Sequence, residues 1–348
     1  MRAAGAVLAA ALTLSAANVE WMAGGGDSPA GAPARRVMFV EPFAVAFEPR
    51  GGDWFVCEHQ GERIVRVTRG GATARLAGSG QAGYSGDGGP AAAATFKDPH
   101  GIVVTQTRQM YVADTLNHVI RRIDLASGLV STLAGDGQPG FAGDGGPAAA
   151  ARFHGTFALA LNRAEDQLYV ADLFNRRIRK IDLRSGTVTT VAGNGGKGTP
   201  PDGAQAAASP LVDPRAVAVD SRGHVYILER GGNALRVVDP AGAIRTVIAP
   251  GQITPDLNGP KHLCIDRRDR VLIADAENHL VRLYDPRTRR TVTVAGTGRK
   301  GGRIDPRDPT RTELNRPHGV AVDARGRLWI SDSYNHRILR VRKYAAEP

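Results

Sequence analysis

The sequence predicts an all-β protein, a six-bladed β-propeller of four-stranded antiparallel blades. Three observations predict it. A short motif that ends in an acidic residue recurs six times, each copy is flanked by other strand-like runs in a fixed order, and the composition is rich in glycine (43 residues) and poor in aromatic residues (5%). Many short strands joined by tight turns have this composition, and self-similarity at a fixed period is the signature of repeat folds.

The recurring motif is clearest at Tyr111–Asp114 and Tyr169–Asp172, and its other copies are Phe55–Glu58, Tyr226–Glu229, Leu272–Asp275 and Trp329–Asp332. The acidic residues of the six copies lie 56, 58, 57, 46 and 57 residues apart. A strand such as Gly319–Asp323 precedes each copy, one such as Arg177–Asp182 follows it, and a fourth such as Val130–Gly135 comes last. Four such strands form an antiparallel sheet that cannot bury both faces alone, so six sheets arranged radially bury one another.

The ring must also close, because an unpaired sheet edge is a liability. The last repeat stops at Tyr344, after its third strand. We therefore predict that Val37–Val40, which has no counterpart in the first repeat, supplies the fourth strand of the last blade. This places the propeller at residues 37–344, a flexible linker rich in Gly, Ala and Pro at 18–36, and a short tail at 345–348.

The first 17 residues differ from the rest of the chain. Arg2 is followed by an apolar, alanine-rich run that ends in Ser15-Ala16-Ala17. This pattern predicts a signal peptide at residues 1–17, cleaved after Ala17, and therefore an exported protein, periplasmic or extracellular. No apolar run reaches the length of about 18 residues that a membrane span requires. We expect a monomer.

The net charge of +11 comes from 39 Arg and 6 Lys against 34 acidic residues. The arginines are spread over every repeat, which favours a general compositional bias over a nucleic-acid patch. The two cysteines, Cys57 and Cys264, fall in blades that are not adjacent, so we expect two free, buried thiols and no disulfide.

The turn after the motif has the form Asp-x-x-Asn-(His or Arg) in four of the six copies, and Asn278-His279-Leu280 spells the tripeptide that names NHL repeats. Over residues 37–344 the chain resembles the NHL-repeat family, in particular exported bacterial NHL-repeat proteins. Gly61 and Gly232 replace the Asn in the first and fourth copies. We interpret the signature residues as structural, binding the backbone of a tight turn; they are Asp114, Asn117, Asp172, Asn175, Asp275, Asn278, Asp332 and Asn335.

A second repeated element joins successive blades. The segment from Gly83 to Pro90 recurs as Gly140 to Pro147, and each is followed by four alanines. Its Gly-Asp-Gly-Gly run offers Asp87 or Asp144 to a calcium ion, but the other carboxylates of an EF-hand are missing. We therefore expect a packed loop that ends in one alanine-rich helical turn.

In a propeller the first strand of each blade lines the central channel. Alignment of the repeats puts six side chains at the start of that strand: Phe43, His100, Thr156, Arg215, Lys261 and His318. Just before them, next to a recurring proline, lie Glu41, Asp98, His154, Asp213, Gly259 and Arg316. Pockets form where loops converge on such a channel, so these residues are the candidate binding site at the channel mouth.

Two weaker resemblances suggest chemistry at this mouth. The segments Pro99-His100-Gly101 and Pro317-His318-Gly319 resemble NHL-fold amidating lyases, and that resemblance implies His100 and His318 as zinc ligands, with His154 or Asp98 as the third. A gluconolactonase-type propeller would instead hold calcium through carboxylates such as Glu41, Asp98 and Asp213. Zinc and calcium are therefore the candidate cofactors, and neither is required by the sequence.

These observations favour an exported binding or scaffold module for a protein, peptide or glycan, using its loop face and channel mouth. The alternative is a metal-dependent lyase or hydrolase, lactonase-like, with its site at the same mouth. Three His or His and Asp side chains that converge would favour the enzyme, whereas a channel plugged by Arg215 and Lys261 would favour the binding module. A nucleic-acid partner is not expected, because export argues against RNA and the channel offers Phe43 alone rather than a row of aromatic stacking platforms.

Overall fold

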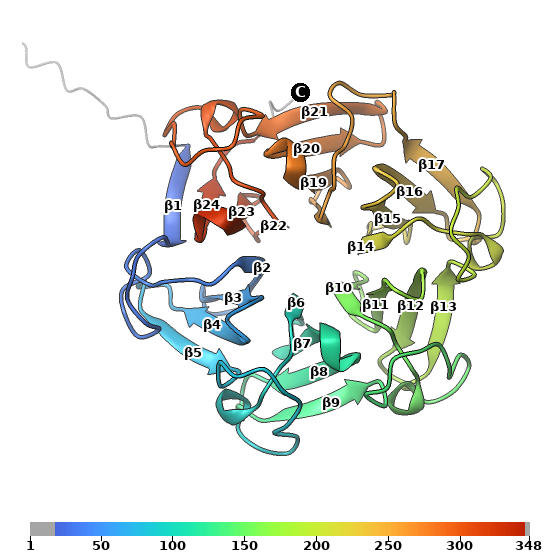
Figure 1. Cartoon of the computed structure of the whole chain (residues 1–348), viewed down its shortest axis with the longest axis horizontal. Helices are drawn as coiled ribbons and strands as arrows, with labels where there is room; N and C mark the ends of the chain where they lie inside the picture. Colours follow the sequence, from blue (N-terminus) through green and yellow to red (C-terminus); the bar gives the residue numbers. More distant parts are fainter. Residues whose placement is uncertain (1–17, 345–348) are drawn as a thin grey trace, which may run out of the picture.

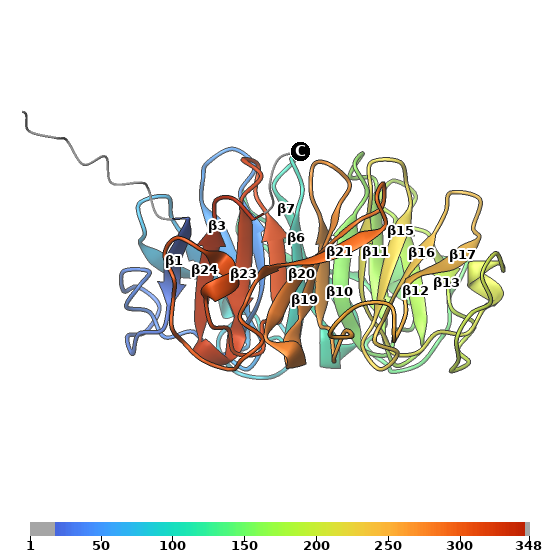
Figure 2. The same ribbon diagram turned by 90° about the horizontal axis from the view of Figure 1, so that it is seen from above.

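The structure, a computed structural model, describes residues 18–344. Six four-stranded antiparallel sheets are arranged radially around a central channel, and their first strands lie innermost (Figure 1). Seen from the side, the blades form a disc with loops on both faces (Figure 2). The predicted six-bladed propeller is confirmed.

The strands follow the predicted repeat order. The first strands are β2 (Pro42–Phe47), β6 (Pro99–Val104), β10 (Thr156–Leu161), β14 (Pro214–Val219), β18 (His262–Ile265) and β22 (Gly319–Val322). The second strands, which carry the recurring motif, are β3 (Trp54–Glu58), β7 (Gln109–Asp114), β11 (Gln167–Asp172), β15 (Val225–Glu229), β19 (Val271–Asp275) and β23 (Leu328–Asp332).

The third strands are β4 (Arg63–Val67), β8 (Val119–Asp124), β12 (Arg177–Asp182), β16 (Ala234–Val238), β20 (Leu280–Asp285) and β24 (Arg337–Val341). The outer strands are β5 (Thr73–Ala77), β9 (Val130–Ala134), β13 (Val188–Ala192), β17 (Ile244–Ile248), β21 (Arg290–Ala295) and β1 (Val19–Gly24). Seven single 3-10 turns complete the described elements: η1 (Ala91–Ala93), η2 (Thr115–Asn117), η3 (Ala148–Ala150), η4 (Ala206–Ala208), η5 (Ala276–Asn278), η6 (Pro309–Arg311) and η7 (Ser333–Asn335).

The second strands are the most buried, because each is covered on both faces by neighbouring blades. Every residue of β3 and of β15 is buried, and so is all of β7 after its first residue. The hydrophobic core is accordingly a series of clusters between blades, such as the one in which Ile64 and Phe96 pack with Ile102 and Val112. Blade stacking therefore fixes where the channel strands stand.

The ring closes through the N-terminus, but not through the predicted residues. The closing strand is β1, which pairs antiparallel with β24 from Val19 opposite Val341 to Gly24 opposite Arg337. The prediction of Val37–Val40 was wrong, as was the prediction of a flexible linker over 18–36. Val37 and Phe39 bury their side chains in the core beside the closing blade, whereas Glu20 of β1 pairs with arginines of the last repeat.

The predicted signal peptide at 1–17 and the tail at 345–348 lie outside the described residues. Between residues 18 and 344, no helix is long and apolar enough to cross a membrane. Cys57 and Cys264 are both free, as predicted. Cys57 is buried, and Cys264 is only partly buried.

The signature Asp of each repeat is buried and ties three segments together. In the second blade, Asp114 accepts the backbone N–H of Lys97 at 2.7 Å, and Asn117 donates to Asp114 at 2.9 Å and to the carbonyl of Gly83 at 2.7 Å. These hydrogen bonds thus connect the turn to the start of the first strand and to the loop between blades. Glu58 and Glu229 accept equivalent backbone N–H groups, so the two divergent turns keep this bond.

A buried arginine completes the network in five of the six blades, and the sequence analysis did not single it out. Arg121 has no exposed surface; it bonds to Asp114 at 3.3 Å, to Asp87 at 2.8 Å and to the carbonyl of Ser85 at 2.9 Å. Arg179 makes the same contacts with Asp172 and Asp144. The Gly-Asp-Gly-Gly loops are therefore packed loops whose Asp side chains pair with arginine, and each ends in the expected alanine turn, η1 or η3.

Removal of this arginine will destabilise the second blade. We expect Arg121→Met to lower the free energy of unfolding by about 3 kcal/mol, because it leaves the buried Asp114 carboxylate without its cation. Burial already raises the pKa of Asp114 to about 6, against the lowering effect of Asn117, the Lys97 N–H and Arg121. Urea denaturation measures the change. Arg122→Met, at the exposed neighbouring position, is the control and should shift stability by less than about 0.5 kcal/mol; equal effects of the two variants would contradict this account.

Candidate functional site at the channel mouth

Every first strand is preceded by a left-handed residue, which at five of the six junctions is bonded to the preceding blade. These residues, with φ between 48° and 74°, are Glu41, Asp98, Gly155, Asp213, Gly259 and Arg316. Each preceding blade also has a left-handed residue at its signature turn, and these are Glu62, His118, Arg176, Asn233, His279 and His336. A left-handed conformation is costly for a residue other than glycine, so its recurrence marks a position that the fold imposes.

At five of the six junctions the side chain of the residue in the signature turn accepts the backbone N–H of the left-handed residue that precedes the next first strand. His118 Nδ1 accepts from Gly155 at 3.2 Å and His279 Nδ1 from Arg316 at 3.1 Å. His336 Nδ1 lies 3.5 Å from the N–H of Glu41. The acceptors at two other junctions are Asn233 Oδ1, for Gly259, and Glu62 Oε2, for Asp98. Arg176, at the sixth, has no acceptor to offer, and its guanidinium donates to the carbonyl of Gly195.

Immediately after these junctions, one side chain from each blade points into the channel. They are Phe43, His100, Phe157, Arg215, Lys261 and His318, called the channel ring below. Five of the six were predicted. Thr156 was wrong: it pairs with Asp172 as Pro99 pairs with Asp114, so Phe157 is the equivalent of His100 and Gly155 of Asp98. Thr156 is buried instead, donating to the carbonyl of Val119 at 3.1 Å.

The channel ring closes the channel. Phe43 lies against both histidines, with ring centroids 4.9 Å from His100 and 4.1 Å from His318. Phe157 packs edge-on to His100 at 4.5 Å, and the Arg215 guanidinium lies 4.1 Å from the Phe157 ring centre. The space left between these side chains is about 20 Å³, room for about one water molecule.

Burial and mutual repulsion set the charges of the ring. Burial and the nearby Arg215 cation hold the pKa of His100 well below its usual value, and burial, Lys261 and Arg215 do the same for His318. Burial lowers the pKa of Arg215 to about 9, and burial together with Arg215 lowers that of Lys261 to about 8. At neutral pH the ring therefore holds two neutral imidazoles beside two cations.

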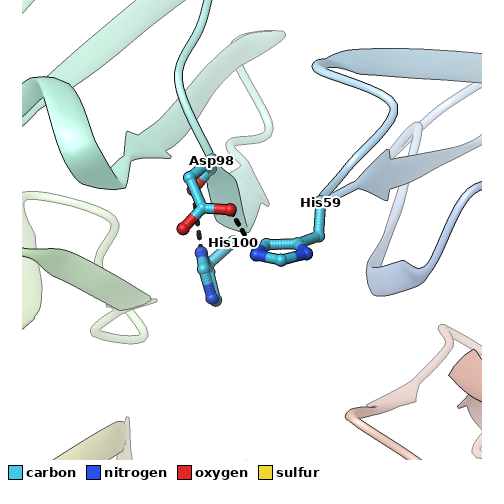
Figure 3. A group of neighbouring side chains, drawn as sticks. All are labelled: His59, Asp98 and His100. Carbon is cyan, nitrogen blue, oxygen red and sulfur yellow. Dashed lines mark hydrogen bonds and ion pairs between the residues drawn. The ribbon is translucent and has the colours of Figure 1, made fainter. Parts of the chain in front are cut away.

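At the edge of the ring, one group of three side chains in the described part of the chain has the spacing of a metal site. His59, Asp98 and His100 bring one ligand atom each to within 4.8 Å of one another (Figure 3). His59 lies parallel to the Phe43 ring at 4.3 Å, its Nε2 pairs with Asp98, and its Nδ1 is 3.1 Å from Glu41. His100 directs Nδ1 to the carbonyl of Asp98 at 2.8 Å.

Comparison with known proteins identifies the repeat. The NHL repeat family model matches residues 314–340. The human NHL repeat-containing protein 2 is 26% identical over 285 residues, which cover 70% of this chain and 39% of that protein. Protein SUPPRESSOR OF QUENCHING 1, chloroplastic, of Arabidopsis thaliana is 24% identical over 287 residues, which cover 76% of this chain and 26% of that protein. This chain contains an NHL repeat and is similar to these proteins over most of its length. It spans between a quarter and two fifths of the length of these relatives.

Solved structures share the fold. An auxiliary nutrient binding protein from Bacteroides ovatus superposes with a TM-score of 0.66 at 17% identity, over 92% of this chain and 75% of that one. A gluconolactonase from Xanthomonas campestris superposes with a TM-score of 0.58 at 14% identity, over 87% and 86%. Streptogramin B lyase gives a TM-score of 0.56 at 11% identity, over 92% and 96%. At these identities the likeness shows the fold alone.

The propeller places apart the histidines that the resemblance to amidating lyases implied as zinc ligands. His100 and Asp98 belong to the three-residue group, but His318 lies on the far side of Phe43. His154 packs between His118 and Phe174, at 5.4 and 5.0 Å between ring centres. Asp213 starts the first strand of the fourth blade and does not join the group.

Two parts of the mouth were missed by sequence reasoning. His59 follows the degraded first motif, and its meeting with Asp98 of the next blade depends on blade packing. Around the ring, the residues two after the signature Asp form an exposed apolar rim on the same face, made of Leu116, Phe174 and Tyr334 at 38, 48 and 38% exposure. The signal was available for this rim, because these residues occupy equivalent places in Asp-x-x-Asn turns.

The junction histidines make the propeller sensitive to acid. Burial lowers the pKa of His118 and of His279 below 6.5, the ordinary value that applies in the unfolded chain. The unfolded chain therefore binds protons more readily, so stability falls as the pH drops below about 6.5. Protonated Nδ1 also cannot accept the N–H of the next blade, at about 1 kcal/mol per bond.

We expect the double variant His118→Asn/His279→Asn to lose less stability between pH 7.5 and pH 5 than the natural protein, because asparagine serves the same junction at Asn233 and does not titrate. Urea denaturation at the two pH values measures this. Asp114 and Asp172, whose pKa burial raises to about 6, act in the opposite direction but equally in both proteins. His224→Asn, outside the junctions, is the control. An unchanged acid loss in the double variant would contradict the role of these bonds.

Proposed function

We propose that this NHL propeller is an exported binding module that takes a protein, peptide or glycan on the face around the channel ring. The observation that carries the proposal is the combination of a closed channel and an exposed apolar rim. The ring leaves about 20 Å³, too little for a substrate to enter from this face. Leu116, Phe174 and Tyr334 stand exposed around it, where a macromolecule can cover them.

The charges on this face favour a ligand of mixed polarity. On one side lie the carboxylates of Glu41 and Asp98, flanking His59. On the other lie Lys261 and Arg316, with Arg316 bonded to Glu277 at 2.7 Å and 5.2 Å from the centre of the Tyr334 ring. Aromatic and arginine side chains set among polar groups are typical of the residues that contribute most to binding interfaces. The Bacteroides ovatus protein with the same fold is described as nutrient binding, which supports a binding role.

The rim residues should carry the affinity. Ligands would be selected from a peptide display library and a glycan array with the full-length chain, and their affinities measured by calorimetry. We expect Leu116→Ala/Phe174→Ala/Tyr334→Ala to weaken a selected ligand at least tenfold, because truncation of apolar anchors at the centre of an interface typically costs more than 1 kcal/mol each.

The matched control is Leu129→Ala/Val292→Ala, which removes equally exposed apolar side chains at 45 and 48% exposure from outside the rim. It should leave the affinity unchanged. Equal losses in the two variants, or the absence of any ligand in both selections, would contradict the proposal.

A metal-dependent lyase or hydrolase is the second candidate, and the convergence of His59, Asp98 and His100 favours it. Two His and one Asp with an open position are the donor set of a catalytic zinc site. The set fits in number and type. However, both ring nitrogens of His59 already face carboxylates, those of Glu41 and Asp98. Arg215, which lowers the pKa of His100, also repels a second cation. A bound metal would hold a water or substrate group at the open position.

Metal content separates the two candidates. On the enzyme account, elemental mass spectrometry of the untagged protein finds about one zinc or other transition metal per chain, and His59→Ala loses it. His154→Ala is the control, because His154 lies at the same mouth outside the group, and this variant should retain the metal. The absence of a stoichiometric metal from the natural protein after supply of zinc would exclude the enzyme candidate at this group.

A further inference from the structure

Beyond the channel ring, the channel widens on the opposite side into a chamber whose lining side chains are mostly apolar. The chamber has a volume of about 500 Å³ and is lined by the first strands of all six blades. Its apolar lining includes Ala46, Val104, Leu161, Val219, Ile265 and Val322. Because the channel ring fills the mouth end, the chamber is closed at that end, and its volume lies within the range of small-molecule pockets, about 300–1,000 Å³.

The walls are apolar for a structural reason. In each first strand the repeat places small and β-branched residues, which suit a strand packed on both sides. Ala46, Ala160 and Ala218 keep 7 or 8% of their surface exposed although they lie deep in the propeller, and all three line the chamber. Apolar surface facing a chamber this large gains free energy when an apolar molecule displaces its water.

One polar atom at the inner end lacks a partner. His262 lines both the chamber and the space between the ring side chains, so it stands at the boundary between the two. Its Nδ1 is buried and forms no hydrogen bond. A bond to the backbone of Val320 favours the protonated ring, so the ring donates there, and Nδ1 is left as an acceptor. Burial lowers the pKa of His262 to about 4, which keeps the ring neutral near pH 7.

The outer end is polar. Asn162, Arg163 and Glu165, from the turn between β10 and β11, contribute to the lining, and Glu165 holds the N–H of Gln106 in the neighbouring blade at 2.7 Å. The chamber therefore has a polar entrance, an apolar body and a single inner acceptor.

We propose that this chamber binds a small molecule with an apolar body and a hydrogen-bond donor, such as a hydroxyl group, at its inner end. The apolar body fills the space between the first strands. Nδ1 is buried, so binding requires the His262 ring to turn this atom toward the chamber. The donor then satisfies the acceptor that the protein leaves unpaired, a strong source of selectivity in a buried site. This site is separated from the channel-mouth site by the ring and does not depend on it.

The first test measures binding of the fluorescent apolar amine N-phenyl-1-naphthylamine to the full-length chain at pH 7.5. We expect one saturable site per chain. Ala160→Trp and Ala218→Trp, each of which fills part of the chamber, should weaken the probe at least tenfold. Ala74→Trp, on the exposed side of the outer strand β5, is the matched control and should bind as the natural protein does. Circular dichroism and thermal unfolding verify that each variant is folded.

The second test addresses the inner acceptor and does not depend on the tryptophan variants folding. The isomers 1-octanol and heptyl methyl ether have the same atoms, but only the alcohol donates a hydrogen bond. We expect the natural protein to prefer the alcohol by about three- to tenfold in displacement of the probe. His262→Phe should abolish this preference while it retains the probe.

Absence of saturable probe binding, or unchanged binding in folded tryptophan variants, would overturn the chamber as a site. Equal displacement by the two isomers would overturn the role of His262. Neither result would bear on the peptide or glycan ligands of the rim, so failure here is distinguishable from failure of the proposed binding face.

Discussion

One hydrogen bond between neighbouring blades sets the geometry of the channel. Its donor is the backbone N–H of the left-handed residue that precedes the first strand of one blade, and its acceptor is the side chain of the left-handed residue in the signature turn of the preceding blade. It recurs at five of six junctions with different acceptors: an imidazole at His118, His279 and His336, an amide at Asn233 and a carboxylate at Glu62. What is constant is the presence of an acceptor atom and the left-handed backbone conformation of both residues. The histidine of the NHL signature thus connects neighbouring blades by a hydrogen bond.

Because these bonds fix where each first strand begins, the side chain two residues after the junction lies at the same level of the channel in every blade. Six side chains then meet in a space too narrow to stay open. The buried Asp networks hold the same part of the chain in place. Asp114 accepts the backbone N–H of Lys97, the residue just before the junction. The channel is consequently divided into a polar mouth and an apolar chamber, and the two proposed sites follow from that division.

Much of this could be predicted from the sequence. The repeat spacing predicts six blades, and the motif turns predict where strands end, because these features are local. The alignment also predicts five of the six ring residues. It fails at Thr156 because the third blade has Gly155 at the junction and no proline to mark the register, and a one-residue slip moves the channel position to Phe157. The closing strand was missed because Val19–Gly24 directly follows the alanine-rich run.

The residues that the sequence did not indicate are those whose partners come from other blades. His59 is recognisable as a site residue only in the structure, where blade packing brings it into contact with Asp98 and Glu41. Arg121 and Arg179 appear as members of an arginine-rich composition until the structure shows them buried against two carboxylates each. The unpaired acceptor of His262 has no sequence signal, since it depends on which atoms the closed ring leaves without a partner.

A high-resolution crystal structure of the full-length chain grown with 1-octanol tests the division of the channel most directly. The account predicts octanol in the chamber with its oxygen at His262 Nδ1, the six ring side chains in mutual contact, and no more than about one water between chamber and mouth. A continuous column of water through the ring, or octanol bound at the mouth with the chamber empty, would contradict it.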